Sequence, residues 1–177
     1  DSTNTWGANY QSPNNNLQAK TVERLPFTVS VVKDEEALRR AVKIRQSAYG
    51  RHVPELASQL GSPESYDYEP GTVVILAESK LDRTPLGTMR IQTNAYKPLS
   101  LEDSVELPKS LQNRTLAEAT RLGISNGRMG RVIKSAMFKA FYEYCSESMI
   151  DWMVNHAFRA IFILSLIHIS EPTRPSQ

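Results

Sequence analysis

The stretch LAEATRLGI, residues 116–124, has the composition of an interior strand but carries two charged side chains, Glu118 and Arg121. Burying a charge is costly unless the charge is paired or takes part in chemistry. A carboxylate can accept a proton, and a guanidinium can bind an anion through two parallel hydrogen bonds. Alternation predicts that Glu118 and Thr120 point to one face, with Leu122, and that Arg121 points to the other. An edge strand with one polar face explains Glu118 and Thr120 poorly and Arg121 somewhat better, so we treat the stretch as a candidate site.

Other polar residues interrupt apolar patterns upstream. Arg45 lies on the apolar face of a predicted helix, and Tyr49 falls on the same face. Arg45 either extends to the edge of that helix or faces a cleft. Asp67, in ESYDYEPG, fits an ordinary turn or capping role and also a functional carboxylate. Arg90 alternates with apolar residues in TMRIQT, so it lies on a solvated hairpin face or points into a site.

Hydrophobic periodicity predicts the elements that must carry these residues. The expected strands and helices are, in order, strand 27–33, helix 35–49, helix 54–60, strands 71–78, 88–94 and 116–124, helix 131–147 and strand 151–157. A hairpin turn is expected at RTPLG, residues 83–87, and an irregular connection at 95–113. The order predicts an α/β fold with a mixed sheet, in which the unit 116–157 is a parallel crossover.

Composition limits the classes of function. The chain has 177 residues, which favours one domain, and its net charge of +2 argues against nucleic acid as a partner. A single cysteine, Cys145, fits a reducing, cytoplasmic compartment, and we interpret it as a core or surface residue rather than a nucleophile. The start of the chain has no signal-peptide pattern, and the apolar stretch 157–169 is too short and too polar to span a membrane. The sequence suggests no metal site.

Taken in chain order, the polar residues form a set that resembles the acyl-homoserine-lactone synthases. The set resembles more closely their relatives, the long-chain N-acyl amino acid synthases of the FeeM type and the exosortase-associated acyltransferases. The matching residues are Arg45, Tyr49, Asp67, Arg90, Glu118, Thr120 and Arg121. The resemblance covers roughly residues 28–160. The lactone synthases carry a Trp soon after the first-helix motif, where this chain has RHVPELASQLGSP, so the resemblance favours an amino acid acceptor over a lactone product.

The resemblance implies a GNAT acyltransferase fold and an N-acyltransferase reaction. A long-chain acyl group would pass from the phosphopantetheine thioester of an acyl-carrier protein to the amine of an amino acid. Glu118, through a water, is the expected general base, and Thr120 is expected to orient it. Arg45 and Tyr49 would line the acceptor side. Of Arg90 and Arg121, one would bind the acceptor carboxylate and the other would fix Glu118 or Asp67.

The loop SNGRMGR, residues 125–131, is a partial match to the GNAT loop that binds the coenzyme A pyrophosphate at a helix N-terminus. Gly127 and Gly130 could cradle one phosphate. A basic patch formed by Arg128, Arg131 and Lys134 suits an acidic acyl-carrier protein, with acyl-coenzyme A as the alternative donor and no permanently bound cofactor. A solvated basic helix start explains the same residues.

The ends of the chain are expected to lie outside the domain. Residues 1–22 read as a disordered leader or linker, and residues 23–163 as the GNAT-like domain. Residues 164–177 begin with LSLIHISEPTR, which resembles the translation of a sequencing adaptor, although a natural apolar segment is the alternative. If the domain ends near Ile163 it is truncated, since a GNAT domain has further strands, and the strand 151–157 would expose an edge.

Other functions stay open at this point. A conventional acetyl-coenzyme A-dependent GNAT acetyltransferase and a lactone synthase-like enzyme are the enzymatic alternatives. A non-catalytic GNAT-like binding module, or an inactive fragment, is the alternative outside enzymes.

Overall fold

The computed structural model describes residues 5–6, 24–157 and 160–165. Its strands are β1 (Thr5–Trp6), β2 (Phe27–Val31), β3 (Thr72–Ser79), β4 (Pro85–Thr93), β5 (Leu116–Ile124), β6 (Trp152–Ala157) and β7 (Ala160–Ser165). Its helices are α1 (Glu35–Gly50), α2 (Pro54–Gln59), α3 (Ser100–Ser104), α4 (Gly130–Glu147) and the 3-10 helix η1 (Ser65–Tyr68). The predicted mixed α/β class is therefore confirmed.

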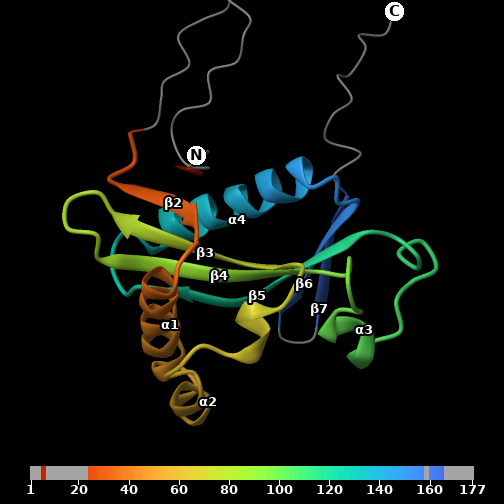
Figure 1. Cartoon of the computed structure of the whole chain (residues 1–177), viewed down its shortest axis with the longest axis horizontal. Coiled ribbons are helices and arrows are strands. Elements are labelled where there is room, and N and C mark those ends of the chain that lie inside the picture. The colour runs from red at the N-terminus through yellow and green to blue at the C-terminus, as the bar shows by residue number, and fades with distance from the viewer. Residues whose placement is uncertain (1–4, 7–23, 158–159, 166–177) are drawn as a thin grey trace, which may run out of the picture.

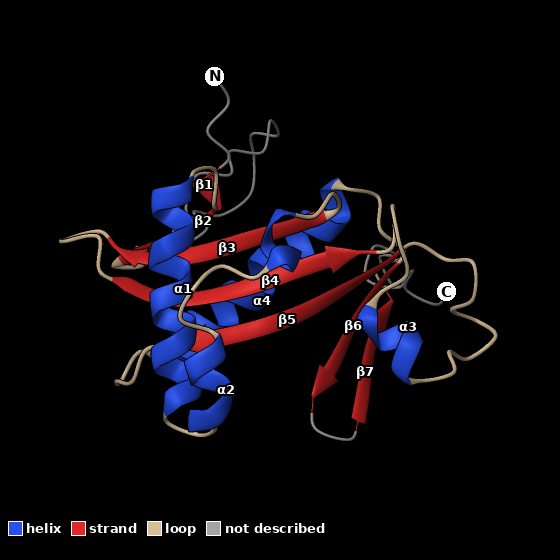
Figure 2. Cartoon of the chain, turned by 60° about the horizontal axis from the view of Figure 1, so that its bottom comes forward, coloured by secondary structure: helices blue, strands red, loops and turns tan. Residues whose placement is uncertain are grey.

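The described strands form a seven-stranded sheet in which each strand lies beside the next in the sequence. All neighbours are antiparallel except β5 and β6, which are parallel, as the crossover through α4 predicts. Helices cover both faces (Figure 1). In Figure 2, α1 and α2 lie in front of the sheet and α4 lies behind it, while α3 lies near β6 and β7.

Several sequence predictions are wrong in detail. The hairpin turn lies before Pro85, which is the first residue of β4, a position where a strand tolerates proline. The connection 95–113 contains the short helix α3. β7 pairs with β6 along its length, so the strand 151–157 does not have the open edge that the sequence suggested. Two residues of the expected leader, Thr5–Trp6, pair with β2, and its other residues lie outside the described part.

The sheet packs against a helix on each face because both helices are amphipathic. Asp34 accepts a hydrogen bond from the Ala37 amide at 2.7 Å and caps the N-terminus of α1. Apolar residues of α1 pack on β3 in one core cluster. On the other face, Met137 and Phe141 of α4 belong to the larger cluster, with both residues 1% exposed or less. Cys145 belongs to this cluster and is fully buried, and burial raises the pKa of its thiol to about 12.

The strands β5 and β6 pair only over their first residues. Leu116, Ala117 and Glu118 of β5 lie beside Trp152, Met153 and Val154 of β6. Beyond Glu118 no pairing is recorded, and the two strands diverge in Figure 2. Within the described residues, the backbone groups in the second half of β5 therefore form no ladder with β6.

The second half of β5 contains a bulge. Its pairing with β4 shifts between Thr88 and Arg90, so that Arg121 and Leu122 both lie opposite Met89. Arg121 has a φ of 54°, in the left-handed region that non-glycine residues rarely adopt. Because of the extra residue, each later side chain of β5 points to the face opposite to the one that simple alternation predicts.

Gly123, just beyond the bulge, allows α1 to approach β5 closely. A methyl group added there would lie 3.1 Å from the Arg45 Cα and 3.3 Å from the Ala48 Cβ. We expect Gly123→Ala to lower the free energy of unfolding by about 1–3 kcal/mol, because α1 must move away from the sheet. Urea denaturation measures this change. Gly50→Ala is the control, because its added methyl would meet Ala57 at an ordinary 3.7 Å. Equal effects of the two substitutions would contradict the close contact.

Candidate active site

A network of charged side chains joins α1, η1, β4 and β5. Arg45 of α1 donates two hydrogen bonds to the Asp67 carboxylate of η1, both at 2.9 Å. Both side chains have an exposed fraction of 0%. This planar, bidentate pair is the buried centre of the network, and it fixes η1 against the first helix.

Glu64, which immediately precedes η1, is the second carboxylate of the network. Arg121 donates to it through Nε at 2.8 Å and through Nη2 at 2.7 Å. Arg45 and Arg90 each donate a further bond to Glu64 Oε2, at 3.2 and 3.1 Å. Glu64 therefore accepts hydrogen bonds from all three guanidinium groups and connects the α1 end of the network to β5.

Arg90 lies between the two carboxylates and Thr120. Its Nη1 contacts Asp67 Oδ1 at 3.4 Å, and its Nε donates to the Thr120 hydroxyl at 3.1 Å. Thr120 in turn donates to Gln92 at 3.3 Å. The β4 face that carries Arg90 is buried against α1 and η1 and is not a solvated hairpin face.

The network holds three guanidinium groups and two carboxylates, which leaves one excess positive charge. The pKa of Glu64 is lowered, mainly by its hydrogen bond with Arg121. Burial tends to raise the pKa of Asp67, but the bonds from Arg45 outweigh burial, and the net shift is downward. Burial lowers the pKa of Arg90, whereas the hydrogen bond with Glu64 raises that of Arg121.

The bulge in β5 explains why Arg121 joins this network. Simple alternation predicted that Arg121 points away from Glu118 and Thr120, and that prediction is wrong. The bulge turns Arg121 toward α1 and η1. Leu122 instead packs against the core cluster between the sheet and α4 (the α4-face core). Two consecutive residues, Thr120 and Arg121, thus reach the same group of side chains.

The pattern ESYD explains how η1 presents its carboxylates. Asp67 accepts a hydrogen bond from the Glu64 amide at 2.8 Å, and the Asp67 amide donates to the Glu64 carbonyl at 2.9 Å. This local capping arrangement holds the two carboxylates side by side. Sequence reasoning missed Glu64, although the acidic pair three residues apart before a strand was a usable signal.

Glu118 lies on the same face of β5 as Thr120, next to the point where β6 separates. It is 3% exposed and lies opposite Gln92 of β4. Ser100, the first residue of α3, donates to Glu118 Oε2 at 3.4 Å. α3 is held over this part of β5 by a cluster of leucines that includes Leu116. Glu118 is therefore beside the charged network but covered by α3.

Tyr49 and η1 border the network. Tyr49 is half-buried on α1 and is close enough to raise the pKa of Arg121 slightly, after the larger effects of Glu64. On the opposite side the Tyr66 ring contacts two cations, Arg90 at 5.4 Å and Lys97 at 4.3 Å from its centroid. Both predicted acceptor-side residues of α1 thus lie at the network.

The residues predicted to bind the donor lie at the start of α4. Gly127 and Arg128 are exposed, and Gly130 begins the helix, where no side chain caps the described N-terminus. Arg131 and Lys134 are exposed on the first turns of α4. The structure does not bring these residues into the charged network. They follow the end of β5, beyond the bulge.

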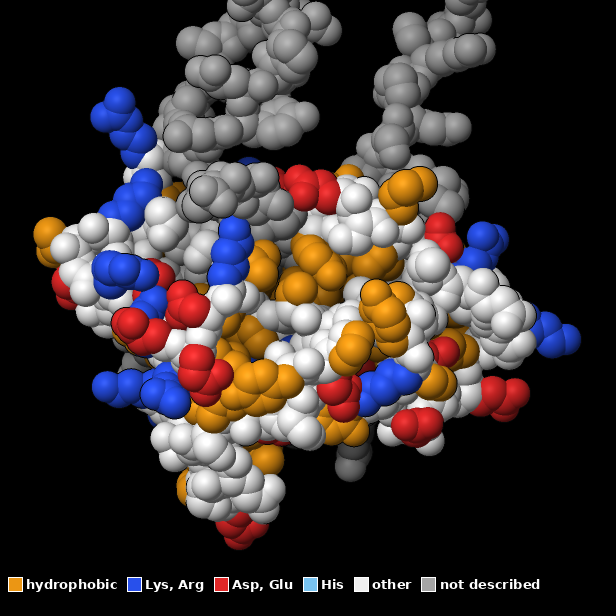
Figure 3. Space-filling model, in the orientation of Figure 1, with side chains coloured by type: hydrophobic (Ala, Val, Ile, Leu, Met, Phe, Trp, Pro, Cys, Tyr) orange, Lys and Arg blue, Asp and Glu red, His pale blue; other side chains and the backbone are white. Residues whose placement is uncertain are grey.

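The face shown in Figure 3 does not favour one sign of charge. Figure 3 shows acidic and basic side chains interspersed over the face of Figure 1, in line with the net charge of +2. Among the residues that the structure describes, no group of histidine, cysteine and acidic residues could hold a metal ion. The described helices include none that is long and apolar enough to cross a membrane.

Comparison with known proteins supports the fold. No protein-family model matches the sequence, and no curated protein matches it. The structure is similar to FeeM, an N-acyl amino acid synthase from uncultured soil microbes, with a TM-score of 0.57, 14% identity, and coverage of 73% of this chain and 70% of FeeM. The chain has the GNAT fold.

Other solved structures agree on this fold. A GNAT family acetyltransferase from Brucella melitensis in complex with acetyl-CoA has a TM-score of 0.52 and 10% identity, with coverage of 84% of this chain and 91% of that one. The aminoglycoside acetyltransferase HMB0005, from an uncultured soil metagenomic sample, has a TM-score of 0.53 and 13% identity, with coverage of 77% and 82%. At these identities the likeness shows the fold alone.

The buried Arg45–Asp67 pair generates a stability prediction. We expect Asp67→Asn to lower the free energy of unfolding by about 3–5 kcal/mol at pH 7, because a buried guanidinium loses its charged partner. The Asp67 pKa is lower in the folded than in the unfolded chain, so its contribution is present above the usual value of 3.8 and is lost as pH falls through the folded pKa. The difference between wild type and variant should therefore shrink at acid pH.

Chemical denaturation from pH 7 to acid pH measures both effects. Arg39→Gln is the control, because it removes a surface pair with Glu35 in which the two side chains are 73% and 48% exposed. That change should stay within about 0.5 kcal/mol. An Asp67→Asn effect as small as the control, or one independent of pH, would contradict the network as described.

Proposed function

We propose that this chain is an N-acyltransferase that moves a long-chain acyl group from an acyl-carrier protein to the amine of an amino acid. The observation that carries the proposal is the placement of a charged network with one excess guanidinium beside Glu118, on the half of β5 that β6 leaves unpaired. A zwitterionic acceptor needs a cation for its carboxylate and a base for its ammonium group. This face of β5 carries both.

Arg121 is the residue that we assign to the acceptor carboxylate. Its side chain is 28% exposed, whereas those of Arg45 and Arg90 are 0% and 4% exposed. Glu64 occupies its Nε and Nη2, which leaves Nη1 for a substrate carboxylate. Arg90 then has the orienting role, because it ties Thr120 to both carboxylates.

Glu118 is the proposed general base. The amine arrives as an ammonium group and must lose a proton before it can attack a thioester. Since Glu118 is buried beneath α3, the proton would reach it through an intermediary, either a water or the hydroxyl of Ser100 that is bonded to it. Ser100 is exposed and can face both the substrate side and Glu118.

The donor would lie along the unpaired half of β5. Gly127 and Gly130 follow this segment and lead into the uncapped start of α4, where amide groups and the helix dipole favour a phosphate. Exposed Arg128, Arg131 and Lys134 would contact an acidic carrier protein. This placement directs the thioester toward the bulge and toward Glu118.

The reaction balances without a resident cofactor. The neutral amine attacks the thioester carbonyl, and backbone amide groups of β5 are available to donate to the oxyanion. A carbon–nitrogen bond forms, the carbon–sulfur bond breaks, and the thiolate leaves with a proton from the attacking nitrogen. The products are an N-acyl amino acid and the free phosphopantetheine thiol. Such a reaction belongs in the cytoplasm, where acyl groups are attached to acyl-carrier proteins.

Two independent comparisons support this proposal. The ordered motif set resembles the N-acyl amino acid synthases, and the fold is similar to that of FeeM, which is described as an N-acyl amino acid synthase. The main alternative is an acetyl-coenzyme A-dependent acetyltransferase. The similar Brucella melitensis structure, which is in complex with acetyl-CoA, favours that alternative. Comparing long-chain acyl-carrier protein with acetyl-coenzyme A as donors separates the two.

Glu118→Gln tests the assignment of the base. We expect kcat to fall by about 10²–10⁴-fold, with a smaller change in KM for the amino acid, because the variant keeps the shape of the side chain but cannot accept a proton. Steady-state kinetics from pH 6 to 9 measure the loss, which added base should lessen in the variant. Glu55→Gln, at an exposed site on α2, is the matched control. Near-normal turnover in Glu118→Gln would refute the assignment.

Charge reversal at the start of α4 tests the donor. We expect Arg128→Glu with Arg131→Glu to raise KM for acyl-carrier protein at least about tenfold and to affect acyl-coenzyme A less, because the carrier protein presents an extended acidic surface. Lys139→Glu, at an exposed position later in α4, is the control and should change neither KM. Equal losses with both donors would show that the patch serves the phosphate alone, and the docking proposal would fail.

A further inference from the structure

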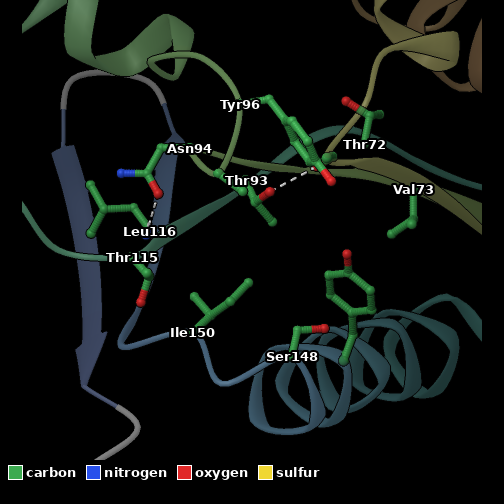
Figure 4. Close-up of a pocket in the computed structure, with 12 residues that line it drawn as sticks. Thr72, Val73, Thr93, Asn94, Tyr96, Thr115, Leu116, Ser148 and Ile150 are labelled. Carbon is green, nitrogen blue, oxygen red and sulfur yellow. Dashed lines mark hydrogen bonds between the residues drawn. The ribbon is translucent and has the colours of Figure 1, made fainter.

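A cavity of about 340 Å³ lies at the opposite end of β5 from the loop that precedes α4. Its wall combines the first residues of β3, the end of β4 with the connection after it, the start of β5, and the residues at and after the end of α4 (Figure 4). In Figure 4, Tyr96 lies on one side of the cavity, and Ser148 and Ile150 lie on the other. The charged network and Glu118 do not line it.

The wall of the cavity is uncharged but rich in hydroxyl groups. Its lining residues include no aspartate, glutamate, lysine, arginine or histidine. Apolar surface comes from residues such as Val73 and Ile150, and hydroxyl groups come from Thr72, Thr115 and Ser148. A charged ligand would lose its hydration here without meeting an opposite charge, which is unfavourable. The cavity therefore selects for uncharged ligands.

Two tyrosines give the cavity an aromatic character. Tyr96 lines the cavity and is 74% exposed, so most of its ring is open to a ligand. Tyr144 is half-buried, and burial raises the pKa of its phenol, while a hydrogen bond with Ser148 opposes this shift in part. Aromatic rings with free faces favour a ligand that itself has a flat or ring-shaped face.

Some polar groups of the wall are already engaged, which shows what remains for a ligand. Asn94 accepts from the Leu116 amide at 2.9 Å and donates to the Arg114 carbonyl at 2.8 Å. Thr93 donates its hydroxyl to the Gly71 carbonyl at 3.1 Å, so it can only accept. The Thr115 hydroxyl accepts from the Asp151 amide at 2.9 Å, and Ser148 is hydrogen-bonded to Tyr144. Thr72 can therefore still donate or accept toward a ligand, and Thr115 can still donate.

We propose that this cavity binds a small uncharged ring compound that carries hydroxyl groups. By volume it holds about ten non-hydrogen atoms, the size of one ring with its substituents. Tyr96 stacks on the ring, and hydroxyl groups at the far wall pair with those of the ligand. A fatty chain fits less well, because it would bury the Thr72 hydroxyl without a partner. This inference does not depend on the proposed acyl transfer.

Two chemical classes provide such a ring, phenols and sugars, and a set of probe compounds distinguishes them. Resorcinol represents a hydroxylated aromatic ring and methyl β-D-glucoside a hydroxylated sugar ring, while benzoate and 1-octanol represent a charged ring and an apolar chain. Two-dimensional NMR of the full chain, titrated with each probe at millimolar concentration, reports binding at the amides of the lining residues. We expect one or both hydroxylated rings to shift these amides saturably, and benzoate and octanol to bind at least about tenfold more weakly.

Variants locate the binding. Tyr96→Ala should raise Kd about three- to tenfold, as expected for the loss of a stacked ring. Ala95→Trp, at an exposed lining position, should fill the cavity and abolish saturable shifts. Tyr68→Ala removes an exposed tyrosine that does not line the cavity and should leave Kd unchanged.

Three outcomes would overturn the proposal. The first is the absence of saturable shifts with both hydroxylated rings, and the second is octanol binding as tightly as either ring, which would indicate an acyl site. The third is an unchanged Kd in Tyr96→Ala and Ala95→Trp. Loss of N-acyltransferase activity in the assays above would leave these results unaffected, so the two proposals fail separately.

Discussion

The bidentate pair between Arg45 and Asp67 is the interaction on which the arrangement of the site depends. Both side chains are fully buried, so neither charge is tolerable without the other. The pair fixes η1 to α1, and the capping geometry of η1 then places Glu64 where Arg90 and Arg121 can reach it. One ion pair thus sets the relative positions of a helix, a turn and two strands.

The bulge in β5 has the complementary role of supplying the exposed member of the network. Without the extra residue, Arg121 would point into the α4-face core, where no carboxylate of the network lies. With it, Arg121 reaches Glu64, and Leu122 fills the core position instead. A left-handed backbone at a non-glycine residue is costly, and the two hydrogen bonds to Glu64 offset that strain.

The two ends of β5 offer different chemical environments. Beyond Glu118 the strand loses β6 as a neighbour, and the network, the bulge and the uncapped start of α4 follow in order. Before Glu118 the strand begins at a cavity whose wall is uncharged. Because α3 and its leucine cluster lie over β5 between these regions, on the Glu118 face, a charged acceptor and an uncharged ring compound would not compete for one place.

The sequence by itself determined the order of the main helices and strands, the mixed α/β class and most residues of the network. Amphipathic periods, the Asp34 cap and the apolar strands are local properties, and Arg45, Asp67, Arg90 and Thr120 stood out because they violate local patterns. Only the tertiary structure decided the facing of Arg121, the membership of Glu64, the pairing of β7 and the existence of the cavity. A bulge is defined by pairing with a second strand, and a cavity by the ends of several elements, so neither leaves a signal within one segment.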